Sequence, residues 1–231
     1  MNLLLYHAVT GAELTAAVKC GKPLAWMACR LSSSGDGISG VPPALPPDSM
    51  LMLTDEMPVQ GHDPARVAQE LAQAAQSLNC AKVLLDFQRP RCVESEQIVR
   101  AVLQAAPCPV GVSESHAAGF DCPVLVSPPP LWTSLEEQID PWRSRQIWLE
   151  AVQEDAVVTV TDTGSHYAPC LAHGDFSFLD ARLQVAYRIE TTEDAVCVYL
   201  HRGQKELDGL LAQASHRGIC TAVGLYQQLC R

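Results

Sequence analysis

Short apolar runs recur along the whole chain of 231 residues, and they constrain its fold more than any other feature of the sequence. Each run has the length of a strand and stops at polar residues, glycine or proline, as strands in the core of a domain do. Eight such runs predict eight strands, at residues 3–7, 24–29, 50–53, 82–87, 110–112, 124–126, 147–151 and 221–226.

Segments with the periodicity of helices lie between several of these runs. Apolar residues recur at helical spacing in residues 11–19, 64–78 and 94–105. Asp63 and Pro64 are typical of a helix start, as the N-cap and the first helical residue. This alternation of strands and helices predicts an α/β fold, a (β/α)8 TIM-like barrel. A doubly wound open sheet is the alternative, but no glycine-rich phosphate loop follows residues 3–7.

The predicted barrel is irregular in two places. Residues 32–47 are rich in serine, glycine and proline, so the second helix should be short or missing. A β-rich insertion of about residues 155–202 separates the seventh strand from the eighth, with hairpin turns expected at residues 162–164 and 191–194. A helix at residues 205–216 then leads into the last strand.

Composition limits the domain count and the partners. With 48% hydrophobic residues the chain can bury one full core, so we expect residues 1–231 to form a single barrel domain. Acidic residues outnumber basic ones by 26 to 16 and the net charge is -10, which argues against binding to nucleic acid.

The cysteines and the start of the chain bear on its location. Ten cysteines occur without a C-x-x-C pair, so we expect reduced thiols. The first apolar run lacks a basic flank and is too short for a signal peptide or a membrane span. These features predict a cytoplasmic protein without a membrane partner. No H-x-H or H-E-x-x-H spacing occurs, and we expect neither a metal nor a cofactor.

Polar residues at strand ends are the candidates for a functional site. In a (β/α)8 barrel the carboxyl ends of the strands meet at one mouth, so side chains from different strands converge there. The run at 82–87 ends at Asp86 and Gln88. The other candidates that end or follow runs are Asp55, Glu56, Glu114 and Glu150.

Glu150 is the strongest of these candidates for a functional residue, because a charge inside an apolar strand needs a partner or a function. Its alternative is a structural ion pair with Arg30 or Arg89 inside the barrel. Trp132, held by a run of three prolines, is a candidate to stack on a ligand at the rim, although packing under a loop is equally compatible with the sequence. Tyr226, at the end of the last strand, is a second aromatic candidate.

The strand that ends at Asp86 resembles a known family. Residues 83–88, Val-Leu-Leu-Asp-Phe-Gln, are similar to the end of the fourth-strand motif of family 18 glycoside hydrolases, the chitinase-like barrels. In that motif aspartates lead to an aromatic residue and then to the catalytic glutamate. The resemblance places Asp86 at the last aspartate, Leu84 at an earlier one, Phe87 at the aromatic and Gln88 at the glutamate.

The carboxyl half of the chain resembles the same family in its order of elements. A strand, a β-rich insertion, a helix and a last strand follow one another in both. Residues 223–227 are similar to the family's last strand, with Tyr226 where a substrate-stacking tryptophan is usual.

The resemblance implies a sugar-cleaving chemistry from which this chain departs. In such enzymes a protonated carboxylic acid gives its proton to the leaving oxygen, and the neighbouring aspartate orients the substrate's acetamido group as the nucleophile. The amide of Gln88 donates hydrogen bonds but has no acid-base equilibrium near neutral pH. We therefore predict a barrel that binds a carbohydrate or a small polar ligand through Asp55, Asp86, Gln88, Glu150, Tyr226 and Trp132, with weak or no hydrolysis.

Two other functions remain open at this point. One is an active glycoside hydrolase whose acid is Glu114, Glu150 or Glu56, because every strand end can contribute to the mouth. The other is a scaffold or partner-binding protein that has no catalytic role.

Overall fold

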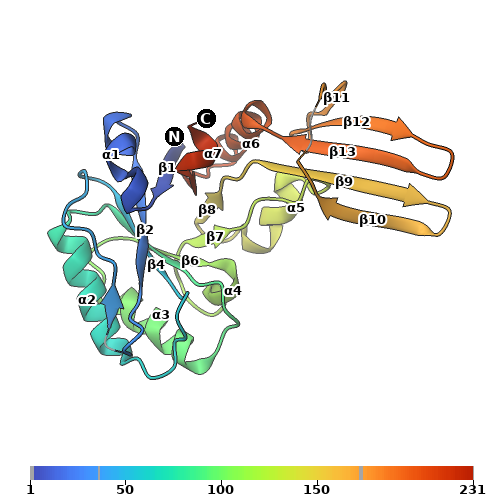
Figure 1. The fold of residues 1–231 in the computed structure, drawn as a ribbon. Coiled ribbons are helices and arrows are strands. Elements are labelled where there is room, and N and C mark those ends of the chain that lie inside the picture. The colour runs from blue at the N-terminus through green and yellow to red at the C-terminus, as the bar shows by residue number, and fades with distance from the viewer. Residues whose placement is uncertain (1–2, 36, 172–173, 231) are drawn as a thin grey trace.

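Eight parallel strands close into a barrel in the computed structural model, which describes residues 3–35, 37–171 and 174–230 (Figure 1). Strand β1 pairs with β14 on one side and with β2 on the other, which closes the sheet. The predicted (β/α)8 barrel is confirmed. In order around the barrel, its strands are β1 (Leu4–Val9), β2 (Leu24–Leu31), β4 (Met50–Thr54), β5 (Lys82–Asp86), β6 (Val110–Ser113), β7 (Val124–Val126), β8 (Ile147–Glu150) and β14 (Thr221–Leu225).

Helices follow most of these strands and cover the outside of the barrel. The long helices are α1 (Gly11–Lys19), α2 (Pro64–Ser77), α3 (Val93–Ala105) and α6 (Gln204–His216). The short ones are α4 (Glu114–Ala117), α5 (Leu135–Ile139), the 3-10 turn η1 (Asp140–Trp142) and α7 (Tyr226–Leu229). Asp63 caps α2 as predicted, accepting a hydrogen bond from the Ala65 amide at 3.0 Å. None of the helices in the described ranges has the length and apolar character of a membrane span.

The segment between β2 and β4 forms no helix in its described residues, as its composition predicts. It contains instead the short strand β3 (Ile38–Ser39), which runs antiparallel to β2. The indole nitrogen of Trp26 in β2 donates a hydrogen bond to the Gly40 carbonyl at 2.7 Å and fixes the end of β3. This segment therefore carries a short strand that pairs with the end of β2 where a covering helix would otherwise be expected.

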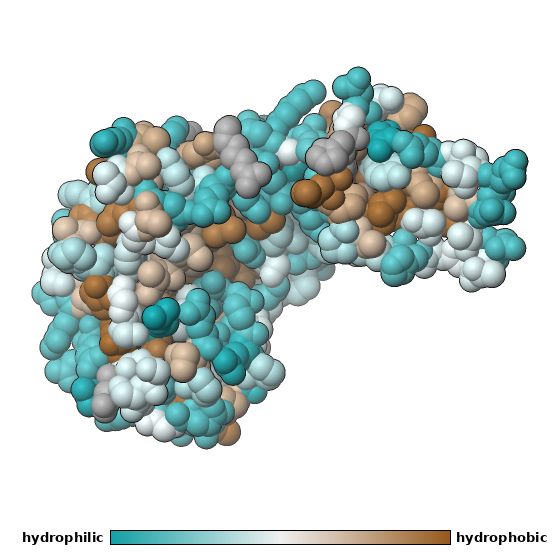
Figure 2. All heavy atoms as spheres, in the orientation of Figure 1, coloured by the Kyte–Doolittle hydropathy of each residue, from teal (hydrophilic) through white to brown (hydrophobic). Residues whose placement is uncertain are grey.

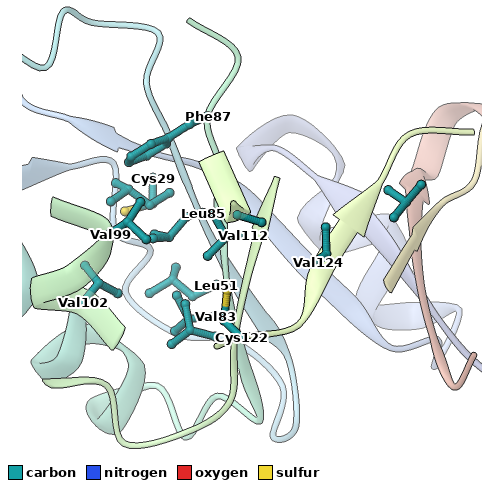
Figure 3. Packing of buried hydrophobic residues seen from close by; sticks show 14 of the residues in the cluster. Cys29, Leu51, Val83, Leu85, Phe87, Val99, Val102, Val112, Cys122 and Val124 are labelled. Carbon is teal, nitrogen blue, oxygen red and sulfur yellow. The ribbon is translucent and has the colours of Figure 1, made fainter. Parts of the chain in front are cut away.

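The barrel strands bury both of their faces, one in each of two cores. Alternate residues of β5 point to opposite sides: Val83 and Leu85 pack toward the helices (Figure 3). Leu84 belongs to the cluster inside the barrel. The interior is filled at its centre by Trp148, which is 0% exposed. Gly111 faces that ring, and a Cβ atom added there would lie only 2.3 Å from Trp148 Cε3. The barrel is thus a packed core rather than a pore.

The insertion between β8 and α6 forms one antiparallel sheet, which we call the arm. Both predicted hairpins are confirmed. The sequence did not predict that β9 and β13 pair and join the two hairpins, or that β11 extends the sheet. In order across the sheet, its strands are β10 (Gly164–Pro169), β9 (Glu154–Thr161), β13 (Val196–Arg202), β12 (Val185–Thr191) and β11 (Phe178–Asp180). Figure 1 shows the arm extending away from the barrel, and Figure 2 shows a hollowed outline between the two.

A buried arginine fixes the base of the arm to the barrel. Arg202, at the end of β13, is 0% exposed. Its guanidinium donates hydrogen bonds to the carbonyls of Pro129 at 2.7 Å, Leu183 at 3.3 Å and Gln184 at 3.4 Å. Burial lowers the pKa of Arg202, and the nearby Glu154 carboxylate opposes that shift. One side chain therefore joins the loop after β7 to the turn before β12.

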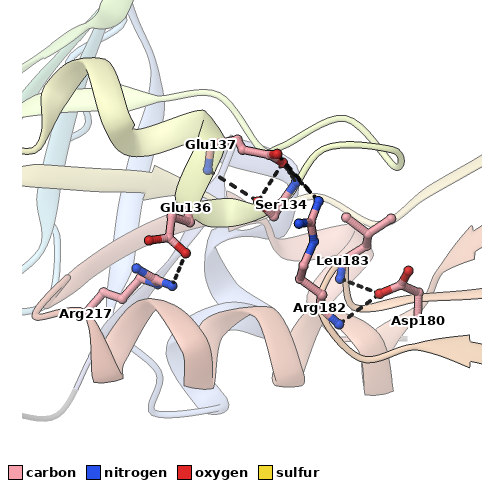
Figure 4. Close-up of polar contacts among 7 residues, drawn as sticks. All are labelled: Ser134, Glu136, Glu137, Asp180, Arg182, Leu183 and Arg217. Carbon is pink, nitrogen blue, oxygen red and sulfur yellow. Dashed lines mark hydrogen bonds and ion pairs between the residues drawn. The ribbon is translucent and has the colours of Figure 1, made fainter.

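Exposed ion pairs add contacts at the same junction (Figure 4). Arg217 at the end of α6 lies 2.9 Å from Glu136 of α5, and Arg182 lies 3.4 Å from Glu137. Asp180 holds the turn by accepting hydrogen bonds from the backbone amides of residues 182 and 183. Pairs as exposed as these contribute little each to stability, because solvent screens their attraction.

Candidate functional site

Strand alternation turns two carboxylates toward the mouth of the barrel. Leu84 and Trp148 belong to the interior core, and residues two positions further along a strand point to the same side. Asp86 therefore follows Leu84 on β5, and Glu150 follows Trp148 on β8. In the paired register Asp86 lies beside Thr54 of β4. The layer above the apolar interior is thus polar, as the apolar runs ending in Asp86 and Glu150 predict.

Gln88 continues the inward side of β5 beyond the strand end. Its amide nitrogen donates a hydrogen bond to Asp86 Oδ1. Burial raises the pKa of Asp86 and the Asp55 charge raises it further, while the hydrogen bond from Gln88 lowers it. Gln88 itself is exposed. The amide therefore lies at the surface of the mouth, with a half-buried carboxylate directly behind it.

Glu150 shares this environment with two other acids. Burial raises the pKa of Glu150, and the charges of Asp86 and Glu114 raise it further. The ion pairs considered from the sequence do not form. Arg30 lies 3.5 Å from Glu56, and the Arg89 guanidinium donates to the carbonyls of Asp55 at 2.8 Å and Glu56 at 2.6 Å. The charges that act on Glu150 are therefore those of other carboxylates, and neither Arg30 nor Arg89 pairs with it.

Asp55 holds a loop of the mouth by hydrogen bonds to the backbone of that loop. It is only 2% exposed, and its two oxygens accept hydrogen bonds from the amides of Gln88 at 2.8 Å and Arg89 at 3.0 Å. Hydrogen bonds to a charged acceptor are among the stronger ones in proteins. Asp55, expected from the sequence as a ligand contact, thus holds the loop that carries Gln88.

The end of β6 contributes a polar network whose two serines the sequence analysis did not single out. Ser113 and Ser115 both donate hydrogen bonds to the Phe87 carbonyl, at 2.9 and 3.1 Å. Ser115 Oγ also lies 2.9 Å from His116 Nδ1. His116 is 1% exposed, and its ring meets Phe87 edge-on at 5.4 Å. The signal available in the sequence was the run of four polar residues, Ser113 to His116, immediately after a short apolar run.

Glu114 occupies the first position of α4, between the two serines. Its carboxylate accepts a hydrogen bond from the Ser127 amide at 3.4 Å, which links the ends of β6 and β7. The charge of Glu114 also raises the pKa of Glu150. Glu114 therefore belongs with Asp86 and Glu150 to the acidic side chains of the mouth. Glu56 differs, because it is exposed in its pair with Arg30.

The two aromatic candidates have other neighbours. Tyr226 has its hydroxyl 3.6 Å from Cys20 Sγ, and its ring lies 6.2 Å from that of His7. Trp132 is 54% exposed and packs edge-on against Tyr167 of the arm at 4.6 Å. The convergence of an aromatic ring with Asp86 and Glu150 stays a prediction that these contacts do not support.

The titratable side chains of the described residues form no group of three or more arranged to hold a metal ion. All ten cysteines lie in the described part of the chain and are free thiols. Burial raises the pKa of Cys29 to about 12. Such a thiol is a small core residue and not a nucleophile.

No protein-family model matches the sequence, and no curated protein matches it. Solved structures do. The spore cortex-lytic enzyme SleL from Bacillus cereus superposes with a TM-score of 0.60 at 10% identity, covering 96% of this chain and 70% of that one. The C-terminal domain of a putative chitinase from Desulfitobacterium hafniense DCB-2 gives 0.62 at 9% identity, covering 100% and 95%. A chitinase from Chromobacterium violaceum ATCC 12472 gives 0.51 at 10% identity, covering 98% and 95%.

These likenesses define the class of fold. The chain is a glycosidase-like TIM barrel with an antiparallel insertion after β8, resembling chitinases and cortex-lytic enzymes in architecture. At 9–10% identity the likeness shows the fold alone.

Proposed function

We propose that this protein binds a carbohydrate at the carboxyl mouth of its barrel and hydrolyses it weakly or not at all. One contact carries the proposal, the hydrogen bond from the Gln88 amide to Asp86. On the motif that the strand resembles, Gln88 stands where the proton donor belongs and Asp86 keeps the neighbouring aspartate. An amide at that place binds a sugar oxygen or acetamido group but cannot protonate a leaving group.

The rigidity of the Gln88 loop supports binding. Asp55 holds the backbone of Gln88 and Arg89 by hydrogen bonds. The position from which the Gln88 side chain extends is therefore set before a ligand arrives. Groups that are ordered in advance lose less conformational entropy on binding. The exposed side of Gln88 offers a sugar the mixed donor and acceptor character that its hydroxyl groups need. The structural likeness to chitinases makes N-acetylglucosamine oligomers the first ligands to test.

Glycoside hydrolysis is the second candidate, and Glu150 is the observation that favours it. A general acid needs a carboxyl group whose pKa is raised toward the working pH, and burial together with two neighbouring acids raises that of Glu150. The neighbouring acids whose charges raise this pKa are Asp86 and Glu114, and Glu114 is a further candidate for the acid. Glu56 is the weakest of the three, because it lies exposed beside Arg30.

A binding titration tests the first proposal. Isothermal titration calorimetry with chitotetraose is expected to show binding to the wild type, and Gln88→Leu is expected to weaken it by roughly tenfold, the value of one hydrogen bond of about 1–1.5 kcal/mol. Gln69→Leu, on the exposed face of α2, is the matched control and should change nothing. Maltotetraose serves as the sugar without acetamido groups. Equal affinity of wild type and Gln88→Leu, or no binding of either sugar, contradicts the proposal.

A set of chromogenic glycosides separates binding from hydrolysis. We expect the wild type to be inactive or nearly so, and Gln88→Glu to gain activity by about 10²–10⁴-fold because it restores a general acid. Activity that is already present in the wild type and lost in Glu150→Gln would establish the hydrolase instead.

A further inference from the structure

The two exposed cysteines of this chain lie at the same place on the barrel. Eight of the ten cysteines are buried or half-buried, whereas Cys20, at the end of α1, and Cys230, directly after α7, are exposed. They are near opposite ends of the sequence, but α1 and α7 both pack on β1. Figure 1 shows the two ends of the chain on the same side of the barrel. The fold therefore brings two accessible thiols together.

Tyr226 connects the two cysteines. Its hydroxyl lies 3.6 Å from Cys20 Sγ, and its carbonyl accepts a hydrogen bond from the Cys230 amide at 3.0 Å. Burial raises the pKa of Cys230 and the charge of Cys20 raises it further, whereas Lys22 lowers it. A neighbouring charge shifts a pKa in this way only over a short distance. The two thiols are therefore neighbours in space.

A histidine beside Cys230 can take up its proton. Cys230 Sγ lies 3.5 Å from His7 Nδ1. Burial lowers the pKa of His7 and the charge of Lys22 lowers it further, so the ring is neutral at neutral pH and can accept a proton. A thiol with an adjacent base reaches its reactive thiolate form more readily.

We propose that Cys20 and Cys230 form a dithiol site, which a low-molecular-weight disulfide of the glutathione type converts into an intramolecular disulfide. The site lies on the outside of the barrel. The proposal does not depend on what the mouth of the barrel binds.

The reaction is two successive thiol-disulfide exchanges. The Cys20 thiolate attacks one sulfur of oxidised glutathione, which forms a mixed disulfide and releases one glutathione thiolate. Cys230 then gives its proton to His7 Nδ1, and its sulfur attacks the Cys20 sulfur and releases the second glutathione. Two electrons pass from the cysteines to the glutathione disulfide, and the two protons that the cysteines lose end on the two glutathione thiols.

A second pair of neighbouring cysteines shows why exposure matters. The charge of Cys108 acts on Cys80, so these two thiols are also close to each other. Both are half-buried, and burial is the main cause that raises the pKa of Cys80 to about 11. A thiol with such a pKa is almost entirely protonated at neutral pH and reacts slowly. Cys20 and Cys230 should therefore form the first disulfide of the chain.

The disulfide would join α1 to the segment after β14, across the seam at which β1 and β14 close the barrel. A disulfide needs Cα atoms about 4.4–6.8 Å apart. The part of the chain that must adjust to reach this distance is short, because α7 has only four residues. Formation of the bond therefore fixes Tyr226 and its segment against α1.

Peptide mapping of the full chain tests the proposal. The reduced protein is incubated with oxidised glutathione, blocked with N-ethylmaleimide and digested without reduction. The wild type is expected to give a cross-linked peptide pair with Cys20 and Cys230 as its first and main product. Cys230→Ser should stop at a mixed disulfide on Cys20, and the cross-link should be lost. Cys197→Ser, which removes a half-buried thiol of the arm, is the matched control and should form the cross-link as wild type does.

Circular dichroism checks that each variant is folded. If Cys230→Ser is not, Cys20→Ser replaces it, and the mixed disulfide is then expected on Cys230. Glutathione on both thiols without a cross-link, a cross-link between two copies of the chain, or a bond from Cys80 to Cys108 that forms first would overturn the proposal. So would the absence of any reaction at Cys20 and Cys230.

Discussion

The barrel and the arm bury their strands in different ways. Each barrel strand is covered on both sides, by the interior around Trp148 and by the helices outside, and closure leaves no free edge among the eight strands. The arm is an open sheet that is anchored at one end, through Arg202 and the small core around Leu131. The comparison indicates that the barrel is stable as a whole, whereas the arm depends on a few contacts at its base.

Arg202→Met is expected to break the arm and spare the barrel. The substitution keeps an unbranched stem but leaves the buried carbonyls of Pro129 and Leu183 without their donor, which costs roughly 3 kcal/mol at about 1–3 kcal/mol for each such group. Hydrogen exchange followed by mass spectrometry should show faster exchange in β9, β12 and β13, with β4 to β6 unchanged.

The matched control for this prediction is Arg182→Met, which removes an exposed arginine at the same junction. Its loss should cost less than about 1 kcal/mol. If the barrel strands exchanged as fast as the arm in Arg202→Met, the two regions would unfold as one unit and the comparison would fail.

Gly111→Ala is expected to do the reverse and weaken the barrel. The added methyl group lies 2.3 Å from Trp148, in an interior that has no room to give, and overpacking of this kind costs about 1–3 kcal/mol. Urea unfolding followed by tryptophan fluorescence should show the lower midpoint. Gly11→Ala is the control, because a methyl group there lies 3.7 Å from Trp26 at ordinary contact distance. Equal midpoints for Gly111→Ala and wild type would show that the interior is looser than its packing indicates.

The smallest expected effect is a change in how the stability of the folded protein depends on pH, caused by Glu150. Burial and two neighbouring acids raise the pKa of Glu150 in the folded protein above its ordinary 4.5, so the folded state binds this proton more tightly than the unfolded chain does. The stability that this proton adds is full below pH 4.5 and is lost as the pH rises through the raised pKa. Glu150→Gln removes that loss, and the variant should be more stable than wild type at pH 7.5.

Urea unfolding of wild type and Glu150→Gln at pH 4 and pH 7.5 measures this difference. The gain from the substitution should appear at pH 7.5 and shrink at pH 4. A gain of the same size at both values would point to packing and not to charge as its cause. Asp55→Asn is not a suitable control, because Asp55 holds the loop of Gln88.

The sequence predicted the barrel because its signals are local. Strands buried on both faces appear as unbroken apolar runs, and each of the eight has its run. The α2 cap at Asp63 depends on neighbouring residues alone. The pairing that joins the two hairpins could not be predicted from the sequence, because β9 and β13 are far apart in the chain and their pairing depends on how the chain between them folds.

The candidate site was predictable only in part, for the same reason. Asp86 and Glu150 could be placed at the mouth because each ends an apolar strand. The role of Asp55 could not be found, because its partners are backbone amides of another loop. Trp132 and Tyr226 were expected beside the acids, yet their ring contacts are with Tyr167 and with His7.

The first residue pair of the arm makes it possible to replace the arm by another sheet. The chain leaves the barrel at Glu154 and returns at Arg202, and these two residues face each other across β9 and β13. The Cα atoms of paired residues in antiparallel strands lie only about 4.5–5.5 Å apart. A few residues of linker can therefore reconnect the barrel where the arm begins, and sheets of other lengths can be grafted there without changing the distance that the barrel must span.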